Sequence, residues 1–144
     1  MSIYRHILVA VDLSNDAEKV VEKAKALAHA FGSTLSLVHV IEPLSYAYGG
    51  DLPVDFSGIQ EEILKQAKQK LATLAARANV PDDRCHLPTG KPSHEIQTLC
   101  ESLKADVVVI GSHGRHGLAL LLGSTANALL HGTKTDVLAV RVGE

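Results

Sequence analysis

The sequence is poor in aromatic residues and has no excess of positive charge. Aromatic residues make up 3% of its 144 residues, and tryptophan is absent. Lysine and arginine number 14 against 16 acidic residues, which gives a net charge of −2 with histidine neutral. Proteins that bind nucleic acids rely on dense basic surfaces and often stack bases on aromatic rings. We therefore expect no nucleic-acid partner.

Cysteines and long apolar runs are also scarce. Cys85 and Cys100 do not form a CxxC pair, so we expect two reduced, largely buried thiols rather than a disulfide framework. The apolar run near the N-terminus is too short for a signal peptide. The longest uncharged stretch, His116 to Thr133, is diluted by small and polar residues and does not resemble a membrane span. These features predict a cytoplasmic protein without membrane insertion.

Several well-known catalytic and phosphate-binding motifs are missing. The sequence contains no GxxxxGK[ST], no GxGxxG after its first apolar run and no GxSxG. His113 and His116 form an HxxH pair without a third metal ligand at a matching distance, so we interpret them as solvated loop histidines. No residue is placed as a general base. Catalysis is therefore not indicated, and a slow ATPase is the most that the sequence leaves open.

What the sequence does contain is an alternation of two hydrophobic periods. Length and composition fit one domain over residues 1–144, with 46% hydrophobic and 21% charged residues. Continuous aliphatic runs indicate strands covered on both faces, and three-to-four spacing indicates helices. We expect strands over 6–12, 34–41, 84–90, 106–111 and 136–142, and helices over 17–31, 59–78, 92–103 and 124–131, with a long loop over 42–57.

Strands that alternate with single helices must run mostly parallel, because each helix carries the chain back to the starting edge. Right-handed crossovers then place helices on both faces of the sheet. The sequence thus predicts one doubly wound α/β domain. Ligands of such folds bind outside the carboxyl ends of the strands, where the strand order reverses. We expect Asp12, after the first strand, and Gly111, at the end of the fourth, to face one crevice there.

The segment Gly111 to Thr125 has the chemistry of a phosphate site. Its last part opens a helix, whose free N–H groups and dipole favour an anion. Serine at this position is also a good helix cap without any ligand. Earlier glycines allow the backbone to approach a chain of phosphates closely. The candidate phosphate-binding residues are Gly111, His113, Gly114, Arg115, Gly123, Ser124 and Thr125.

Asp12 has two interpretations. A carboxylate at this edge could hold Mg²⁺ that bridges phosphate oxygens, because Mg²⁺ is usually bound by one or two carboxylates together with phosphates. An aspartate directly after a strand also commonly closes a turn or caps the next helix. The sequence alone leaves both interpretations open.

Several segments together carry a resemblance to a known family. These are HILVAVDLS, LVHV, GKPSHEI, DVVVIGSHGRHG, LLGSTANALL and DVLAVRV. In this order they resemble the universal stress protein family, and the closing segment is similar to its proteobacterial A branch. The resemblance implies a five-stranded parallel sheet of order 3-2-1-4-5. It also implies a homodimer, commonly paired through the last strand, here Val137 to Val142, whose apolar edge would otherwise be unpaired.

Family members that bind ATP resemble the pattern G-x-x-G, nine residues, then G-[ST], with an aspartate after the first strand. In this chain the gap from Arg115 to Leu122 has eight residues, one fewer. Two functions therefore stay open: an ATP-binding sensor or regulator of the stress response, or a nucleotide-free dimeric interaction module. The residues that the resemblance assigns to the nucleotide are Ala10, Val11, Asp12, Val40, Gly111, Gly114, Gly123 and Ser124.

Overall fold

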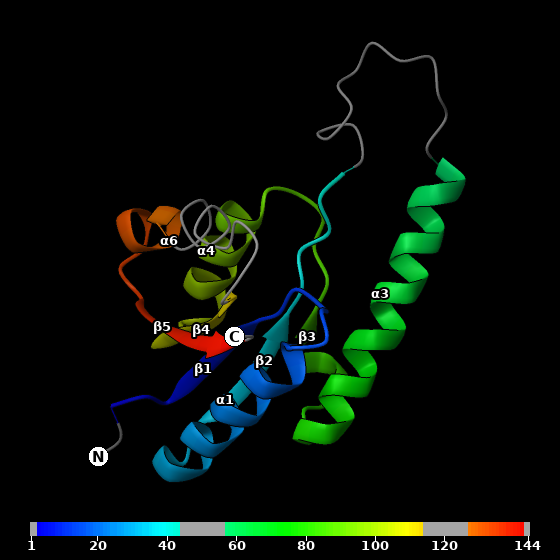
Figure 1. Cartoon of the computed structure of the whole chain (residues 1–144). Helices are drawn as coiled ribbons and strands as arrows, with labels where there is room; N and C mark the ends of the chain where they lie inside the picture. The colour runs from blue at the N-terminus through cyan, green and yellow to red at the C-terminus, as the bar shows by residue number, and fades with distance from the viewer. Residues whose placement is uncertain (1–2, 44–56, 114–126, 143–144) are drawn as a thin grey trace.

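The computed structural model describes residues 3–43, 57–113 and 127–142. All strand pairs are parallel, and the sheet has the order β3-β2-β1-β4-β5, which confirms the predicted doubly wound topology (Figure 1). The strands are β1 (His6–Ala10), β2 (Thr34–Val38), β3 (Cys85–His86), β4 (Val107–His113) and β5 (Asp136–Val142). The described helices are α1 (Ala17–Phe31), α3 (Ser57–Ala78), α4 (Pro92–Leu103) and α6 (Asn127–Gly132), with a 3-10 turn η1 (Asp82–Arg84).

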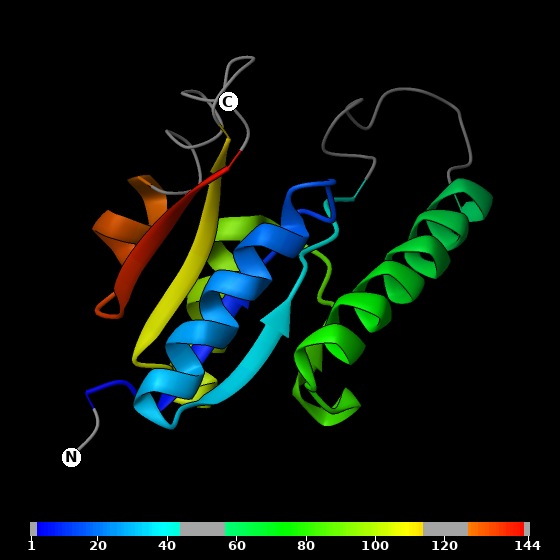
Figure 2. The ribbon, with the colours of Figure 1, turned by 60° about the horizontal axis from the view of Figure 1, so that its bottom comes forward.

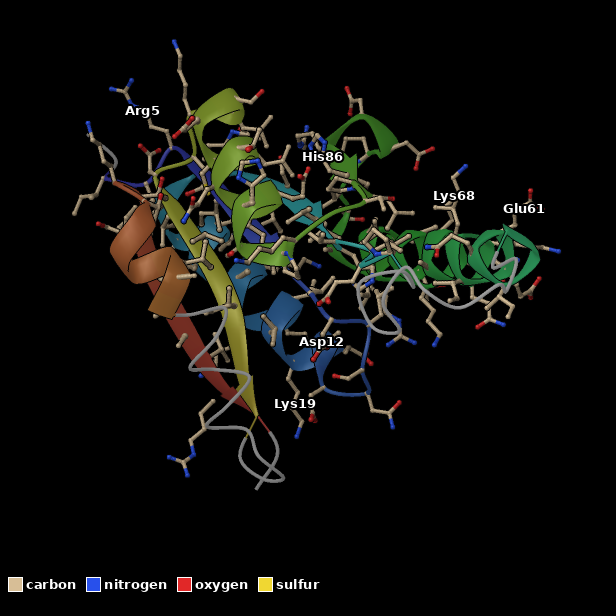
Figure 3. All side chains as sticks on the ribbon, turned by 90° about the horizontal axis from the view of Figure 1, so that it is seen from above. Arg5, Asp12, Lys19, Glu61, Lys68 and His86 are labelled. Carbon is tan, nitrogen blue, oxygen red and sulfur yellow. The ribbon has the colours of Figure 1, made fainter. Side chains whose placement is uncertain are left out.

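The sheet separates two hydrophobic cores. Successive strand side chains point to opposite faces, so Ile7 and Val9 pack against α1 and α3 whereas Leu8 packs against α4 and α6. Figures 1 and 3 show α1 and α4 on opposite sides of the sheet. Leu8 and Val9 are both fully buried. This burial on both faces explains why the first strand is a continuous aliphatic run.

Helix α1 begins and ends with local contacts. Its C-terminus is Gly32, whose φ of 65° gives the left-handed cap that glycine allows. At its start the Ser14 carbonyl accepts the N–H of Ala17 at 3.1 Å, and the Ser14 hydroxyl accepts the N–H of Asp16 at 3.3 Å. Asp16 occupies the cap position without a side-chain cap hydrogen bond. Of the polar residues before this helix, Ser14 therefore supports its first turn.

Helix α3 is longer than the sheet beneath it. Its 22 residues span roughly 33 Å at 1.5 Å per residue, whereas β2 has five residues. Leu71 and Leu74 are buried against the sheet, but Ile59 is 53% exposed and Ile63 36% exposed. Figures 1 and 2 show the N-terminal half of α3 extending past the strands. The predicted apolar face is correct, but burial covers only its C-terminal part.

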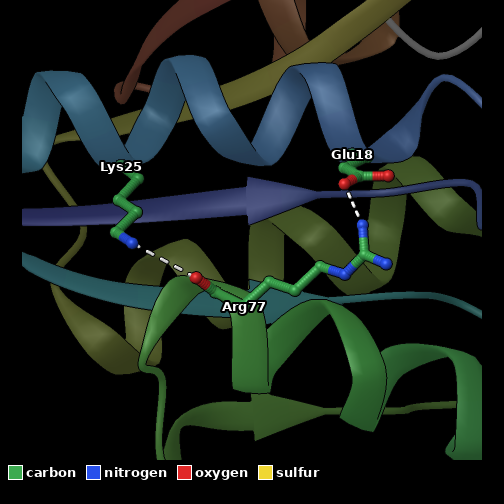
Figure 4. Close-up of polar contacts among 3 residues, drawn as sticks. All are labelled: Glu18, Lys25 and Arg77. Carbon is green, nitrogen blue, oxygen red and sulfur yellow. Dashed lines mark hydrogen bonds and ion pairs between the residues drawn. The ribbon is translucent and has the colours of Figure 1, made fainter.

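Polar contacts join α3 to α1 along their exposed seam (Figure 4). Arg77 forms an ion pair with Glu18, and the Lys25 ammonium donates to the Arg77 carbonyl at 3.2 Å. The two ion-paired side chains are 58% and 46% exposed. Exposed pairs of this kind contribute little stability, so the seam depends mainly on the buried leucines below it.

Strand β4 does not end at Gly111 as predicted. It continues to His113 because β5 pairs with it along its whole length, with Gly111 opposite Val140 and His113 opposite Val142. The pairing of β1 with β4 stops earlier, at Ala10 and Ile110. Gly111 and His113 therefore lie in a strand, and the interpretation of His113 as a loop residue is wrong.

Three other boundaries also differ from the prediction. The regular pairing of β2 ends at Val38, although a single bridge joins Ile41 to Thr89 further on. Of the strand expected over 84–90, only Cys85–His86 forms β3, and Arg84 is the last residue of η1. Helix α6 includes Gly132, which was expected to follow it, and its expected start at Ser124 lies outside the described residues.

Candidate functional site

The strand register brings the candidate residues of β1, β2 and β4 to one edge of the sheet. Ala10 lies opposite Val38 on one side and Ile110 on the other. The next residues, Val11 and Gly111, therefore stand at the same level where the strand order reverses. This is the position at which open parallel sheets bind ligands. The structure thus brings Ala10, Val11 and Gly111 together as predicted.

Asp12 closes the turn that leads into α1 (Figure 3). Its Oδ1 accepts the N–H of Ser14 at 2.9 Å, and the side chain is exposed. Between them Leu13 has a φ of 62°, a backbone conformation that residues other than glycine rarely adopt. The turn interpretation of Asp12 is therefore confirmed.

The end of β2 is held from both sides. The N–H of Val11 donates to the Val38 carbonyl at 2.9 Å, and the His39 ring contacts the Val11 carbonyl through Nδ1 at 2.7 Å. The N–H of Ile41 donates to Pro88 at 2.9 Å. Between these anchors Val40 is partly buried and packs, like Ala10, against the core on the α4 side. Val40 therefore presents a fixed apolar surface near the crevice.

The predicted phosphate cradle is only partly within the described residues. Gly114, Arg115, Gly123, Ser124 and Thr125 lie outside them, as does His116 of the HxxH pair. For His113 the structure describes the backbone, in β4. The described portion of the site consists of Ala10, Val11, Asp12, Val40 and Gly111, and the phosphate-binding portion stays a prediction.

The donor groups near Asp12 limit the kind of metal site that is possible. Within residues 3–43, 57–113 and 127–142 no three or more histidine, cysteine or acidic side chains gather closely enough to hold a metal ion. A single carboxylate fits Mg²⁺ when phosphate oxygens supply further ligands. Among the described residues Asp12 therefore offers a single carboxylate at this edge, and Mg²⁺ there stays a prediction.

A second polar cluster, which the sequence interpretation missed, lies on the α4 face of the sheet. His6 Nε2 is 2.7 Å from the hydroxyl of Ser36, which is fully buried. His86 Nε2 is also buried and makes no hydrogen bond with the described residues. His6 lies two residues before Leu8 in β1, and Ser36 lies two residues before Val38 in β2, so all four side chains are on the same face of the sheet. This alternation of polar residues within apolar runs is the signal that could have revealed the cluster.

Burial disfavours the charged form of both imidazoles. It lowers the pKa of His6 below the ordinary 6.5, although a hydrogen bond to the Leu103 carbonyl opposes the effect. Arg84 lowers the pKa of His6 further, and Asp106 raises it. Burial also lowers the pKa of His86, and the neighbouring His6 adds to this. The cluster therefore resists protonation in the folded protein.

The two cysteines are free thiols, as predicted. Cys100 is buried and Cys85 partly buried. Burial is the main cause that raises the pKa of both thiols. Because the thiolate is the reactive form, neither cysteine is prepared to act as a nucleophile.

The described strands form an open, doubly wound α/β sheet whose order reverses between β1 and β4. The sequence matches the model of the universal stress protein family over residues 3–141. It is 41% identical to universal stress protein A homolog 1 of Coxiella burnetii, over 98% of this chain and 99% of that protein. The chain belongs to the universal stress protein family.

Solved structures share this fold. The hypothetical protein MJ0577 superposes with a TM-score of 0.78 at 24% identity, covering 97% of each chain. A universal stress protein in complex with cAMP gives a TM-score of 0.61 at 24% identity, covering 95% of this chain and 96% of that one.

No helix in the described part of the chain is long and apolar enough to cross a membrane.

Proposed function

We propose that this protein is a homodimeric, cytoplasmic regulator or sensor of the stress response that binds ATP, with Mg²⁺, at the switch-point crevice. The observation that carries this proposal is the position of the exposed Asp12 carboxylate, two residues beyond the point where Ala10 pairs with both neighbouring strands. The family member solved with cAMP gives support, because it binds an adenine nucleotide on the same fold.

Each part of the proposed site has a chemical role. Ala10 and Val40 supply apolar surface for a flat ring, and Asp12 supplies a carboxylate for Mg²⁺. Gly111 keeps the strand backbone accessible at the edge of the crevice. The helix start that the sequence predicts at Gly123 and Ser124, outside the described residues, would supply N–H groups for phosphate oxygens. His113, Gly114, Arg115 and Thr125 would complete the phosphate contacts.

Calorimetric titration with Mg-ATP tests this site. The wild type is expected to bind, and Asp12→Ala and Gly123→Val are expected to lose most of the affinity. Asp82→Ala is the matched control, because Asp82 is an exposed carboxylate on η1, away from the crevice. No heat for the wild type, together with no nucleotide in extracts of the denatured protein, would refute ATP binding. Binding that survives both site substitutions would place the nucleotide elsewhere.

The homodimer is proposed to form through β5. In the described sheet β5 is an edge strand with β4 as its neighbour, and its Leu138 is 41% exposed. Pairing with a second copy would cover this edge. Light scattering should show a dimer that Leu138→Lys weakens, whereas Ile59→Lys, an exposed position on α3, leaves it intact. A wild-type monomer would contradict the proposal.

The alternative function is a dimeric interaction module that binds no nucleotide. The eight-residue gap between Gly114 and Gly123 is the observation that favours it. Under this alternative the glycine segment only turns the chain. The same titration separates the two functions, because the module would remain dimeric and release no heat with Mg-ATP.

A further inference from the structure

We propose that His39 is a positioning residue that holds the two strand ends of the crevice together. The inference rests on the proposed nucleotide site and identifies a residue that orients Val11, Asp12 and Val40 from outside it. The sequence patterns assigned no role to this histidine, which lies in the LVHV segment and follows the regular part of β2.

The argument begins with the hydrogen bonds between β1 and β2. In a parallel ladder, a residue that donates its N–H to one residue of the neighbouring strand accepts with its C=O from a residue two positions further on. Val11 donates to Val38 at 2.9 Å, so its carbonyl would normally accept from the N–H of Val40. Instead, the His39 ring occupies this carbonyl through Nδ1 at 2.7 Å.

The imidazole therefore replaces the last backbone hydrogen bond of the ladder. A carbonyl oxygen can only accept, so Nδ1 of His39 must carry the hydrogen. The Val40 N–H makes no hydrogen bond with the described residues. The two strand ends thus stay joined through the His39 ring, and the Val40 N–H takes no part in the pairing with β1.

The backbone of His39 adds a connection to a third strand. Its N–H donates to the His86 carbonyl at 3.1 Å, so one residue links the ends of β1, β2 and β3. The fixed Val11 carbonyl immediately precedes the Asp12 turn, in which Leu13 adopts a φ of 62°. Such a conformation costs free energy and persists only where its surroundings hold it. His39 supplies one of these restraints from the neighbouring strand.

Two substitutions of His39 separate positioning from general stability. Asn places an amide N–H close to the position of Nδ1 and should keep the hydrogen bond, whereas Leu removes the donor. We expect His39→Leu to raise the Kd for Mg-ATP about tenfold, and His39→Asn by no more than about twofold, as for one hydrogen bond. His29→Leu, at an exposed histidine of α1, is the control and should bind like the wild type.

Measurements without nucleotide keep this inference separate from the proposed function. A long-range ¹H–¹⁵N spectrum of the wild type should show a hydrogen on Nδ1 of His39. Hydrogen exchange of the Ser14 amide, which donates to Asp12 Oδ1, should accelerate in His39→Leu and not in His39→Asn. If the wild type binds no Mg-ATP, the proposed function fails while these two results still judge His39. Three results would overturn the positioning role of His39. These are an Nδ1 without a hydrogen, an amide exchange rate that His39→Leu leaves unchanged, and an equal loss of affinity for Mg-ATP in the Asn and Leu variants.

Discussion

The ring of His6 and the hydroxyl of Ser36 meet inside the protein, 2.7 Å apart, although 30 positions separate them in the chain. The partial burial of His6, and of the neighbouring His86, predicts that stability depends on pH. Burial lowers the pKa of His6 and of His86, so the folded state takes up protons less readily than the unfolded chain. Their contribution to stability is present above the ordinary pKa of 6.5 and is lost as the pH falls through the lowered values. Urea unfolding at a series of pH values should show this decline, and His86→Asn should reduce it. An unchanged slope in that variant would contradict the assignment.

A second prediction concerns the hydroxyl itself. Ser36→Ala removes the fully buried hydroxyl and leaves Nε2 of the partly buried His6 without this partner. The free energy of unfolding should fall by about 1–3 kcal/mol, the cost of an unsatisfied buried polar group. Thr98→Ala is the control, because the exposed Thr98 hydroxyl donates only to the His94 carbonyl of its own helix. Denaturant unfolding measures both variants, and equal effects would argue that the His6–Ser36 contact carries no stability.

A third prediction compares a fully buried apolar side chain with an exposed one. Leu8 of β1 is fully buried against α4, α6 and the neighbouring strands. Leu8→Ala should cost about 2–5 kcal/mol through lost burial and the cavity that remains. Ile59→Ala, at a position that is 53% exposed, should change stability by about 0.5 kcal/mol or less. A large loss at Ile59 in thermal and denaturant unfolding would show that another surface covers the N-terminal half of α3 in solution.

A fourth prediction addresses the contact between α4 and α6. A methyl group at Gly132 would collide with the side-chain amide of Gln97, which donates to the Ala128 carbonyl at 3.1 Å. Gly132→Ala should displace this side chain and destabilise the protein by about 1 kcal/mol, the net worth of one hydrogen bond. Gly58→Ala is the matched control, because the space around Gly58 is open and alanine favours a helix. If both variants unfold like the wild type, Gln97 does not hold α6.

The sequence predicts best those parts of the fold that depend on local pattern. The aliphatic runs of β1 and β4 and the glycine after α1 were sufficient to find these elements, because burial on both faces and left-handed backbone each demand particular residue types. The end of β4 was not predictable, since β5 rather than β4 itself extends the pairing to His113. The exposure of Ile59 likewise depends on the length of the sheet beneath α3.

The candidate site shows the same division. Asp12, Val40 and Gly111 could be assigned to one edge from strand order and the family resemblance. The role of His39 depends on the register between β1 and β2, in which its ring reaches the carbonyl of Val11. A pattern of residue types does not contain that register. The cluster of His6, Ser36 and His86 is intermediate, because the alternation on each strand is visible but the contact between strands is not.

The unequal pairing of β4 with its two neighbours also determines how the sheet would respond to mechanical force. Tension between Tyr4 and Val142 would pull β1 toward its amino end and β5 toward its carboxyl end, so the load passes through β4 in shear. Seven residue pairs join β4 to β5, whereas four join it to β1. In shear, all hydrogen bonds of a seam are loaded together, and the seam with fewer of them is the weaker. The protein would therefore part between β1 and β4, at the crevice itself.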